Sequence, residues 1–530
     1  MHYYRKSAFA LVLFVLMADG VYPQKEKKVL LNARNEKWWV GIIQHGYLMP
    51  IKATYHADTR ANCYGNQAQP LLLSDQGRLI WCENPFSITC KKGCKTIRLN
   101  VPSKSIHMVL AGATLRDAYL YASSHYFPPS GRQPDEALFR FPQYNTWIEL
   151  QYNQNENDIL HYAKGILHNG FPAGVLIIDD NWQEDYGIWE FHPTRFKQPK
   201  AMIDSLHAMG FRVMLWICPF VSPDSETGRE LAEKDFLIKD QLGNPKIIRW
   251  WNGASYLLDF TNPGALEWFK HQLNWIKTNY SVDGFKFDAG DPEFYYDAVS
   301  FSKATPNEHC ELYASLGLDY PFNEFRATWK MGGQPLGQRL RDKRHSWDDL
   351  QQLIPNSLLQ GIMGYPFSCP DLIGGGEIES FLQIDSIDQN LIVRSAQCHA
   401  FMPMMQFSAA PWKILDSIHL QAVKKAVALR MTYISEILEL VKESTVTGEP
   451  VIRMMEYEFP HMGYSCIKDQ FMLGRRIIVA PVTNPTGKKE IYLPPGLWRD
   501  MMHGNDSVAG PCILHRNVPI DEIPFFVKIY

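Results

Sequence analysis

The fold of this chain is decided by residues 175–217, which read VLIIDDNWQEDYGIWEFHPTRFKQPKAMIDSLHAMGFRVMLWI. The stretch contains two apolar runs, 175–178 and 213–217, each short enough for a buried β-strand. Between them, apolar residues recur at helical spacing over 201–209, and Gly210 supplies a stop signal, so a helix is predicted there. A strand, a helix and a second strand in this order form the repeating unit of a parallel sheet.

The same alternation continues on both sides of this unit. Asn262 and Pro263 carry the signals of an N-cap and a first helical turn, and the helix that they open leads into the predicted strand 282–287. An earlier strand is predicted at 146–150. Units of this kind over residues 139–463 favour a closed (β/α)₈ barrel, with a doubly wound sheet as the alternative. The alternative is weakened because no Gly-rich phosphate-binding sequence follows the early strands.

The chain outside residues 139–463 lacks this alternation. Residues 24–138 contain short β-like runs separated by polar turns, as at 38–43 and 106–110, and are predicted to form an N-terminal β-sandwich domain. Residues 464–530 contain further short runs between Pro and Gly turns, which predict a C-terminal β-domain. The sequence therefore predicts an α/β protein in which a TIM barrel is flanked by β-domains.

The composition excludes several classes of protein. Among 530 residues, 53 are basic and 56 are acidic, so the formal net charge is −3 and no nucleic-acid partner is expected. Apolar residues make up 46% and charged residues 21%, as in ordinary globular proteins. We also predict no stable membrane span. The sequence does not determine the oligomeric state, and a homodimer is one option.

The N-terminus has the pattern of a secretory signal peptide over residues 1–20. The basic residues Arg5 and Lys6 precede the apolar run 8–18, and Ala18 and Gly20 supply the small residues of a cleavage site. The apolar run is too short to span about 30 Å of hydrocarbon comfortably, which favours a signal over an anchor. We therefore predict a secretory-pathway protein, either secreted or held in the lumen of the endoplasmic reticulum.

Cysteines and sequons agree with an oxidising compartment. Four of the ten cysteines cluster near the N-terminus: Cys63, Cys82, Cys90 and Cys94. They are predicted to form two disulfides, in any of three connectivities. A zinc site is the alternative, but no second pair of ligands has matching spacing. Asn279 and Asn505 begin Asn-x-Ser sequons, and residues 527–530 carry no retention signal.

Carboxylates directly follow two of the predicted strands. Asp179 and Asp180 come after the run that ends at residue 178, and Asp288 comes after the run that ends at residue 287. Active sites of barrels form at the C-terminal ends of the strands. We therefore expect these side chains to converge on one mouth of the barrel.

Strand geometry gives Asp288 a specific setting. The side-chain period of two places Lys286 and Asp288 on one face, and Phe285 and Phe287 toward the covering helices. A Lys beside a carboxylate favours the ionised form, which suits a nucleophile; a buried structural ion pair is the alternative. A nucleophilic carboxylate implies glycosyl transfer, and a retaining mechanism then needs a second carboxyl group about 5 to 5.5 Å away.

Asp342 is the candidate for that second carboxyl group. The pattern from Ser346 to Asp349 resembles a capping box, which assigns Asp348 and Asp349 to the first turn of a helix and leaves Asp342 outside it. A general acid must hold its proton. We therefore expect the negative charge of the ionised Asp288 to favour the protonated form of Asp342, because two like charges close together repel. Three basic neighbours are then expected to face outward: Arg341, Lys343 and Arg344.

An ordered series of segments resembles glycoside hydrolase family 31. The segments are 178–182 (IDDNW), 215–219 (LWICP), 286–288 (KFD), Arg326 with Asp342 sixteen residues later, 364–367 (GYPF), 370–375 (PDLIGG) and 394–407. The resemblance covers roughly residues 139–480. The DAG sequence at 288–290 and the GYPF segment look most like the myogenesis-regulating glycosidase branch of the family.

The resemblance implies a retaining α-glycosidase without cofactor or metal, in which Asp288 is the nucleophile and Asp342 the acid/base. Asp179 resembles the residue that holds distal sugar hydroxyls, and Arg326 the one that contacts the sugar near the acid. Further residues are implied as walls or supports of the sugar site: Asp180, Trp216, Trp251, Lys286 and Asp371. For Asp180 the alternative is the capping of a turn, for Trp216 core packing, and for Asp371 the orientation of its loop.

One departure from the family concerns the sugar. Many members carry a His in the loop after the seventh barrel strand, whereas residues 404–408 contain none. The branch implies an α-galactoside and the wider family an α-glucoside. We predict an exo-α-glycosidase that releases a terminal hexose with retention, with the galactoside favoured. A catalytically silent sugar-binding or signalling protein of the same fold and an inverting hydrolase are the alternatives.

Overall fold

The computed structural model describes residues 26–32, 36–52, 54–91, 96–102, 106–383, 386–504 and 506–529. The predicted signal peptide at 1–20, Cys94 and Asn505 lie outside these residues. Among the residues that are described, no helix is both long and apolar enough to cross a bilayer.

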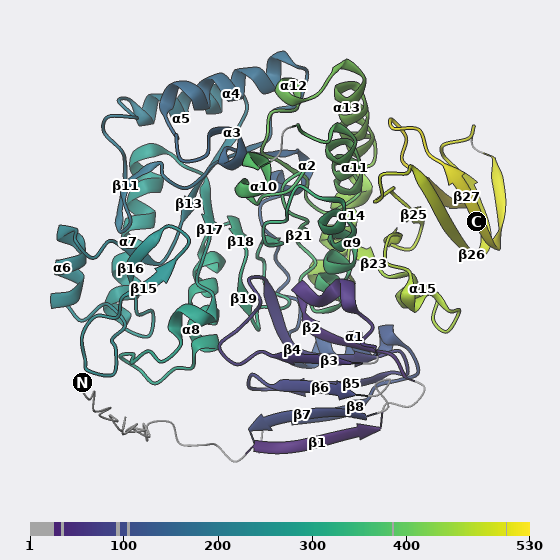
Figure 1. Ribbon diagram of the computed structural model, residues 1–530, viewed down its shortest axis with the longest axis horizontal. Helices are drawn as coiled ribbons and strands as arrows, with labels where there is room; N and C mark the ends of the chain where they lie inside the picture. The colour runs from purple at the N-terminus through teal and green to yellow at the C-terminus, as the bar shows by residue number, and fades with distance from the viewer. Residues whose placement is uncertain are drawn as a thin grey trace, which may run out of the picture.

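An eight-stranded parallel sheet forms the centre of the molecule (Figure 1). Its order is β21 (Ser368–Cys369), β20 (Gln338–Arg339), β18 (Phe322–Phe325), β17 (Gly284–Phe287), β13 (Arg212–Ile217), β10 (Val175–Ile178), β9 (Gln143–Asn145) and β22 (Gln406–Phe407). A parallel bridge between Leu372, which follows β21, and Gln406 in β22 joins the two edges of the sheet. The predicted (β/α)₈ barrel is therefore confirmed.

Helices follow the strands and cover the barrel. They include α4 (Glu156–His168), α5 (Pro199–Ala208), α7 (Pro263–Tyr280), α8 (Pro306–Ser315), α9 (Trp347–Ile362), α11 (Gln389–His399) and α13 (Ser417–Thr432). Two predicted helix starts are confirmed: the Asn262 side chain accepts from the amide of Gly264, and the Ser346 hydroxyl accepts from the amide of Asp349. The strands β10 and β17 are buried throughout, as expected for a sheet covered on both faces.

The predicted strand at 146–150 is wrong. The strand at this place, β9, ends at Asn145, and Trp147–Leu150 form the short helix α3. The Asn145 side chain accepts a hydrogen bond from the amide of Trp147 at 2.8 Å, which turns the chain out of the extended conformation.

The N-terminal region contains two antiparallel sheets, drawn below the barrel in Figure 1. One has the order β1 (Glu26–Asn32), β7 (Thr96–Pro102), β6 (Ser87–Lys91) and β3 (Tyr55–Asp58). The other contains β2 (Trp38–Ile42), β4 (Gln67–Ser74), β5 (Arg78–Cys82) and β8 (Ile106–Leu110). The barrel segment β19 (Thr328–Trp329) pairs with β4, so the loop that follows Arg326 is attached to this second sheet.

The C-terminal β-domain is confirmed as one six-stranded antiparallel sheet. Its order is β23 (Ile452–Arg453), β24 (Phe471–Leu473), β25 (Ile477–Val479), β28 (Phe525–Ile529), β26 (Lys488–Asp500) and β27 (Ser507–Asn517). A small core of its own surrounds the buried Trp498. The sheet packs at the side of the barrel, in yellow in Figure 1.

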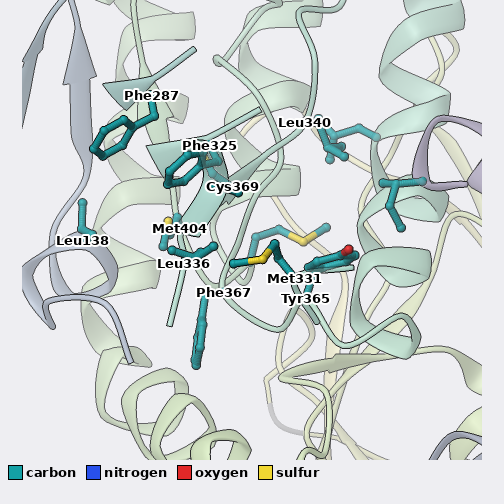
Figure 2. Close-up of a cluster of buried hydrophobic side chains, with 14 of the residues drawn as sticks. Leu138, Phe287, Phe325, Met331, Leu336, Leu340, Tyr365, Phe367, Cys369 and Met404 are labelled. Atoms are coloured by element: carbon teal, nitrogen blue, oxygen red, sulfur yellow. The ribbon is translucent and has the colours of Figure 1, made fainter. Parts of the chain in front are cut away.

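Aromatic packing fixes which side chains of β17 face inward. Phe287 stacks on Phe325 with ring centroids 4.7 Å apart, and Figure 2 shows the two rings side by side. Phe287 also meets Tyr313 of the covering helix α8, with ring centroids 6.0 Å apart. Because successive side chains of a strand alternate, Lys286 faces the barrel interior, as predicted.

The expectation of two disulfides among the four N-terminal cysteines is wrong, because Cys63 and Cys82 carry free thiols. The fold places them in different surroundings. Cys63 packs in a small cluster with Cys310 of α8 and Trp329, whereas Cys82 lies at the end of β5 in the main core.

Candidate active site

One cavity of about 610 Å³ lies at the C-terminal end of the barrel strands. Eight of the predicted site residues line it: Asp179, Asp180, Trp216, Trp251, Lys286, Asp288, Arg326 and Asp342. Asp371 is buried outside the lining. Two carboxylates that are far apart in the sequence, Asp288 and Asp342, therefore face the same space.

Three site loops hold a non-glycine residue in the left-handed region. The φ angles are 74° at Asn181, 57° at Ala289 and 94° at Asp371. Such conformations cost of order 1–3 kcal/mol each and persist where the surrounding structure determines them. They follow β10, β17 and β21, and they turn the chain sharply beside the carboxylates at the barrel mouth.

Asp288 is a buried carboxylate that is held in its ionised form. Its Oδ1 accepts from Arg326 Nε at 2.9 Å and from the amide of Ala289 at 2.8 Å, and its Oδ2 accepts from Trp216 Nε1 at 3.1 Å. Burial acts to raise its pKa, but the charges of Arg326, Lys286 and Arg339 outweigh burial and hold the pKa well below its usual range. This environment suits a nucleophile.

Lys286 pairs with Asp179 instead of with Asp288. Its Nζ donates to Asp179 Oδ2 at 2.6 Å, and both side chains are almost fully buried. The prediction placed Lys286 on the correct face but gave it the wrong partner. The guanidinium of Arg326 takes the position next to Asp288, and Lys286 acts on Asp288 only through its charge.

Arg326 joins the nucleophile candidate to an acidic residue that sequence reasoning left without a role, Asp291. Its Nη1 and Nη2 donate to the two oxygens of Asp291 at 2.8 Å and 2.6 Å. Nη1 also donates to the carbonyl of Gly65 at 2.9 Å, so the N-terminal region contributes to the cavity wall. On the other side, the guanidinium lies 5.6 Å from the ring centroid of Trp251.

Asp342 differs from Asp288 in exposure and in partner. Its side chain is 41% exposed to solvent, compared with 12% for Asp288. Asp342 Oδ1 accepts from Arg339 Nη1 at 2.6 Å, and the side chain of Arg339 is only 1% exposed. One candidate carboxylate is therefore enclosed, and the other remains accessible to water.

The expectation that all three basic neighbours of Asp342 face outward is wrong for Lys343. Arg344 does face solvent, with 60% of its side chain exposed, and Arg341 is exposed at the rim of the cavity. Lys343 is buried because its amide donates to Asp371 Oδ2 at 2.8 Å, which draws the chain inward.

Asp371 contacts Arg339 Nη1 through Oδ1 at 3.0 Å. Burial and the charge of Asp342 raise the pKa of Asp371 to about 7. Asp371 accepts a hydrogen bond from the amide of Lys343, as expected of a residue that orients its loop. Arg339 contacts both Asp371 and Asp342 and so connects the two side chains.

Asp180 both caps a turn and lines the cavity. Its Oδ1 accepts from the amide of Asn181 at 2.6 Å, and its Oδ2 accepts from the Tyr186 hydroxyl at 3.0 Å. Burial, together with the charge of Asp179, raises the pKa of Asp180 to about 6.

The two predicted aromatic walls differ. Trp216 is 1% exposed, so it belongs to the core and also presents its Nε1–H to Asp288. Trp251 is 51% exposed and lies at the rim of the cavity. Trp216 therefore both packs in the core and forms part of the cavity wall.

A group of potential metal ligands lies beside the site, although the sequence pointed to no such cluster. Ligand atoms of Cys63, Asp291 and Glu293 lie within 4.8 Å of one another. Both oxygens of Asp291 already accept hydrogen bonds from Arg326. The positive charge beside these three potential ligands therefore comes from the guanidinium of Arg326.

Arg339 and Glu324 were missed by sequence reasoning. Glu324 lies inside the buried strand β18, between Asn323 and Phe325, where a charged residue was itself a signal of an interior site. Arg339 ends the two-residue strand β20, which has no apolar run to mark it. Arg339 Nε donates to Glu324 Oε1 at 3.0 Å.

A TIM barrel in which two differently held carboxylates line one cavity has the arrangement that glycoside hydrolases use. A model of the family 31 glycosyl hydrolase TIM-barrel domain matches residues 141–440, and the model of the family 31 C-terminal domain matches residues 448–529. The chain belongs to glycosyl hydrolase family 31.

Several known proteins are similar to this chain. Myogenesis-regulating glycosidase of Mus musculus is 32% identical over 437 residues, which cover 79% of this chain and 60% of the relative. Alpha-glucosidase 2 of Bacillus thermoamyloliquefaciens is 24% identical over 459 residues, 80% of this chain and 56% of the relative. The chain thus spans less than two thirds of the length of these relatives.

Among solved structures, the GH31 dextranase of Flavobacterium johnsoniae complexed with glucose superposes with a TM-score of 0.84. It is 20% identical and covers 96% of this chain and 67% of its own. At this level of sequence identity, the similarity shows that the two proteins share a fold.

Proposed function

We propose that this protein is a retaining exo-α-glycosidase that releases a terminal α-linked hexose. The observation that carries the proposal is the pair Asp288 and Asp342, which face one cavity in different electrostatic settings. Membership of family 31 supports this reaction class. The resemblance to the myogenesis-regulating glycosidase branch supports an α-galactoside as the favoured substrate, with an α-glucoside as the second candidate.

The proposed reaction has two displacements. In the first, Asp288 attacks the anomeric carbon while Asp342 donates its proton to the departing glycosidic oxygen. Oδ2 of Asp288 is the freer attacking atom, because it accepts one hydrogen bond and Oδ1 accepts two. In the second displacement, Asp342 removes a proton from water, the water attacks the same carbon, and the ester to Asp288 breaks. Two inversions give net retention.

The remaining cavity residues are proposed to hold the sugar. Asp179, fixed by Lys286, offers acceptor oxygens to sugar hydroxyl groups in the cavity, and Arg326 offers donors beside Asp288. Trp251 provides an exposed ring at the rim on which a sugar ring can stack. This arrangement requires neither a metal nor a cofactor for the proposed steps.

Hydrolysis of two substrates tests the proposal. We expect release of p-nitrophenol from the α-galactoside with a higher kcat/KM than from the α-glucoside, and no release by the Asp288→Asn variant. A higher kcat/KM for the glucoside would overturn the sugar preference alone. No release from either compound, with sugar binding retained in calorimetry, would support the silent sugar-binding protein instead.

We also propose that the chain enters the secretory pathway. The N-terminal signal pattern supports this, and Asn279 of the sequon is exposed near the end of α7. Expressed in a eukaryotic secretory host, the protein is expected to lose mass on treatment with an N-glycosidase, and Asn279→Gln should remove the glycan at that position. An unchanged mass on treatment would contradict glycosylation, and recovery only from the cytosol would contradict secretion.

A further inference from the structure

Two carboxylates and a histidine meet outside the cavity, at Asp75, Glu456 and His461. One potential ligand atom of each residue lies within 4.8 Å of those of the other two. Asp75 is in the turn between β4 and β5, Glu456 is in the short helix α15 (Met455–Glu458), and His461 is in the turn after α15. Since α15 lies between β23 and β24, the cluster connects the N-terminal region with the C-terminal sheet.

Glu456 provides the observation that points to a cation. It is only 2% exposed, and its Oε2 has no hydrogen-bond donor among the residues that the structure describes. Lys37 acts on Glu456 through its charge, but its Nζ donates to Ser465 Oγ at 2.6 Å. Burial, together with the negative charge of Asp75, raises the pKa of Glu456. An unpartnered buried carboxylate oxygen is costly, and a bound cation removes that cost.

Backbone groups orient all three side chains. The amide of Lys37 donates to Asp75 Oδ1 at 2.9 Å, and the amide of His461 donates to Glu456 Oε1 at 2.8 Å. His461 Nε2 lies 3.0 Å from the carbonyl oxygen of Ala113. Because a carbonyl only accepts, the ring donates there, and the lone pair of the neutral imidazole is on Nδ1. Protein metal ligands are commonly oriented by hydrogen bonds of their other polar atom in this way.

We propose that Asp75, Glu456 and His461 bind one Zn²⁺ ion that stabilises the contact between the N-terminal region and the C-terminal sheet. Two carboxylates balance the charge of a divalent ion, and the imidazole favours Zn²⁺, whereas Ca²⁺ and Mg²⁺ take oxygen ligands. His461 is exposed, so its ring can close onto the two buried carboxylates, and water can complete the tetrahedral coordination. The ion has no part in the proposed hydrolysis, because its three ligands do not line the cavity.

Thermal melting of the full chain, first stripped of metal with a chelator, provides the first test. Calorimetric titration with Zn²⁺ gives the Kd. At a Zn²⁺ concentration about 100-fold above that Kd, the melting midpoint should rise by at least about 2 °C, and the same concentration of Ca²⁺ should leave it nearly unchanged. A midpoint that Zn²⁺ does not raise would overturn the proposal. A larger rise with Ca²⁺ than with Zn²⁺ would also overturn it.

Glu456→Gln separates metal binding from a merely structural role. The amide keeps the shape of the side chain and the acceptor for the His461 amide, but it removes the charge. Without metal, the variant should melt at the wild-type temperature or above it, since a buried charge without a close partner is lost. Its affinity for Zn²⁺ should fall at least about 100-fold. Wild-type Zn²⁺ affinity in Glu456→Gln would reject the site.

His461→Ala tests the same site if Glu456→Gln fails to fold, because the side chain of His461 is exposed. It should also lower the Zn²⁺ affinity at least about 100-fold. The matched control is His515→Ala, which removes another exposed imidazole, 3.5 Å from a carboxylate oxygen of Glu490, and should bind Zn²⁺ as the wild type does. Equal affinities of His461→Ala and His515→Ala would contradict the proposal.

X-ray absorption at the zinc edge identifies the ligands without any substrate. The zinc-bound wild type should show nitrogen and oxygen ligands at about 2.0–2.2 Å and no sulfur at about 2.3 Å. Sulfur in the coordination shell would place the ion on cysteines and overturn the proposal. Since neither melting nor absorption depends on turnover, the metal site and the proposed hydrolysis can fail independently.

Discussion

Replacement of Asp288 by Asn is expected to lower kcat/KM for every α-hexoside that the wild type cleaves by at least about 10⁴-fold. The amide has nearly the same shape as the carboxylate but cannot form the glycosyl ester. Arg326 keeps its two hydrogen bonds to Asp291 in this variant, so the site should remain assembled. Steady-state hydrolysis measures the loss, and a thermal melt shows whether the fold persists.

The surface variant Asp319→Asn serves as the matched control for Asp288→Asn and should retain wild-type kcat/KM. Hydrolysis by Asp288→Asn within a factor of about ten of the wild type would mean that another group attacks the sugar, since the loss of a true nucleophile is far larger. Calorimetric titration with the free hexose shows whether the variant still binds sugar when it no longer cleaves.

Replacement of Asp342 by Ala is expected to have the second largest effect, and the effect should depend on the leaving group. For an α-hexoside whose leaving group needs a proton, kcat/KM should fall about 10²- to 10⁴-fold. For an α-hexosyl fluoride, which departs with little acid assistance, the first step should be far less affected. The ratio of the two losses is the measurement, because a general structural defect lowers both rates alike.

Azide should partly restore turnover by Asp342→Ala. The side chain of Asp342 is partly exposed, so a small anion can reach the space that the variant opens. Azide attacks the glycosyl ester without a general base, and in a retaining enzyme the product is the α-hexosyl azide. Equal losses on both substrates, or a β-azide as the product, would contradict the role of Asp342.

Much of the barrel was predictable because its strands carry local signals. The run that becomes β10 is apolar throughout and those that become β13 and β17 are mostly apolar, since both faces of the sheet are covered. Asn262 and Ser346 mark helix starts through side-chain hydrogen bonds that reach only two or three residues along the chain. The same locality made Asp179 and Asp288 visible as carboxylates at the ends of apolar runs.

Other parts of the site depend on contacts that no local pattern encodes. The partner of Lys286 is Asp179, which follows another strand, and the partner of Asp342 is Arg339, from a strand of two residues. The helix at Trp147–Leu150 follows from one side-chain hydrogen bond made by Asn145. In each case the arrangement depends on a hydrogen bond or an ion pair of a side chain, and the spacing of apolar residues along the sequence does not predict such a contact.

The central claim, a covalent bond between a hexose and Asp288, is tested most directly by trapping that bond. A 5-fluoro-α-hexosyl fluoride allows the first displacement and slows the second, so the intact protein should gain the mass of one fluorohexosyl group. Peptide mass spectrometry should place the group on Asp288. An active enzyme that gains no mass, or that carries the sugar on another residue, would contradict the account.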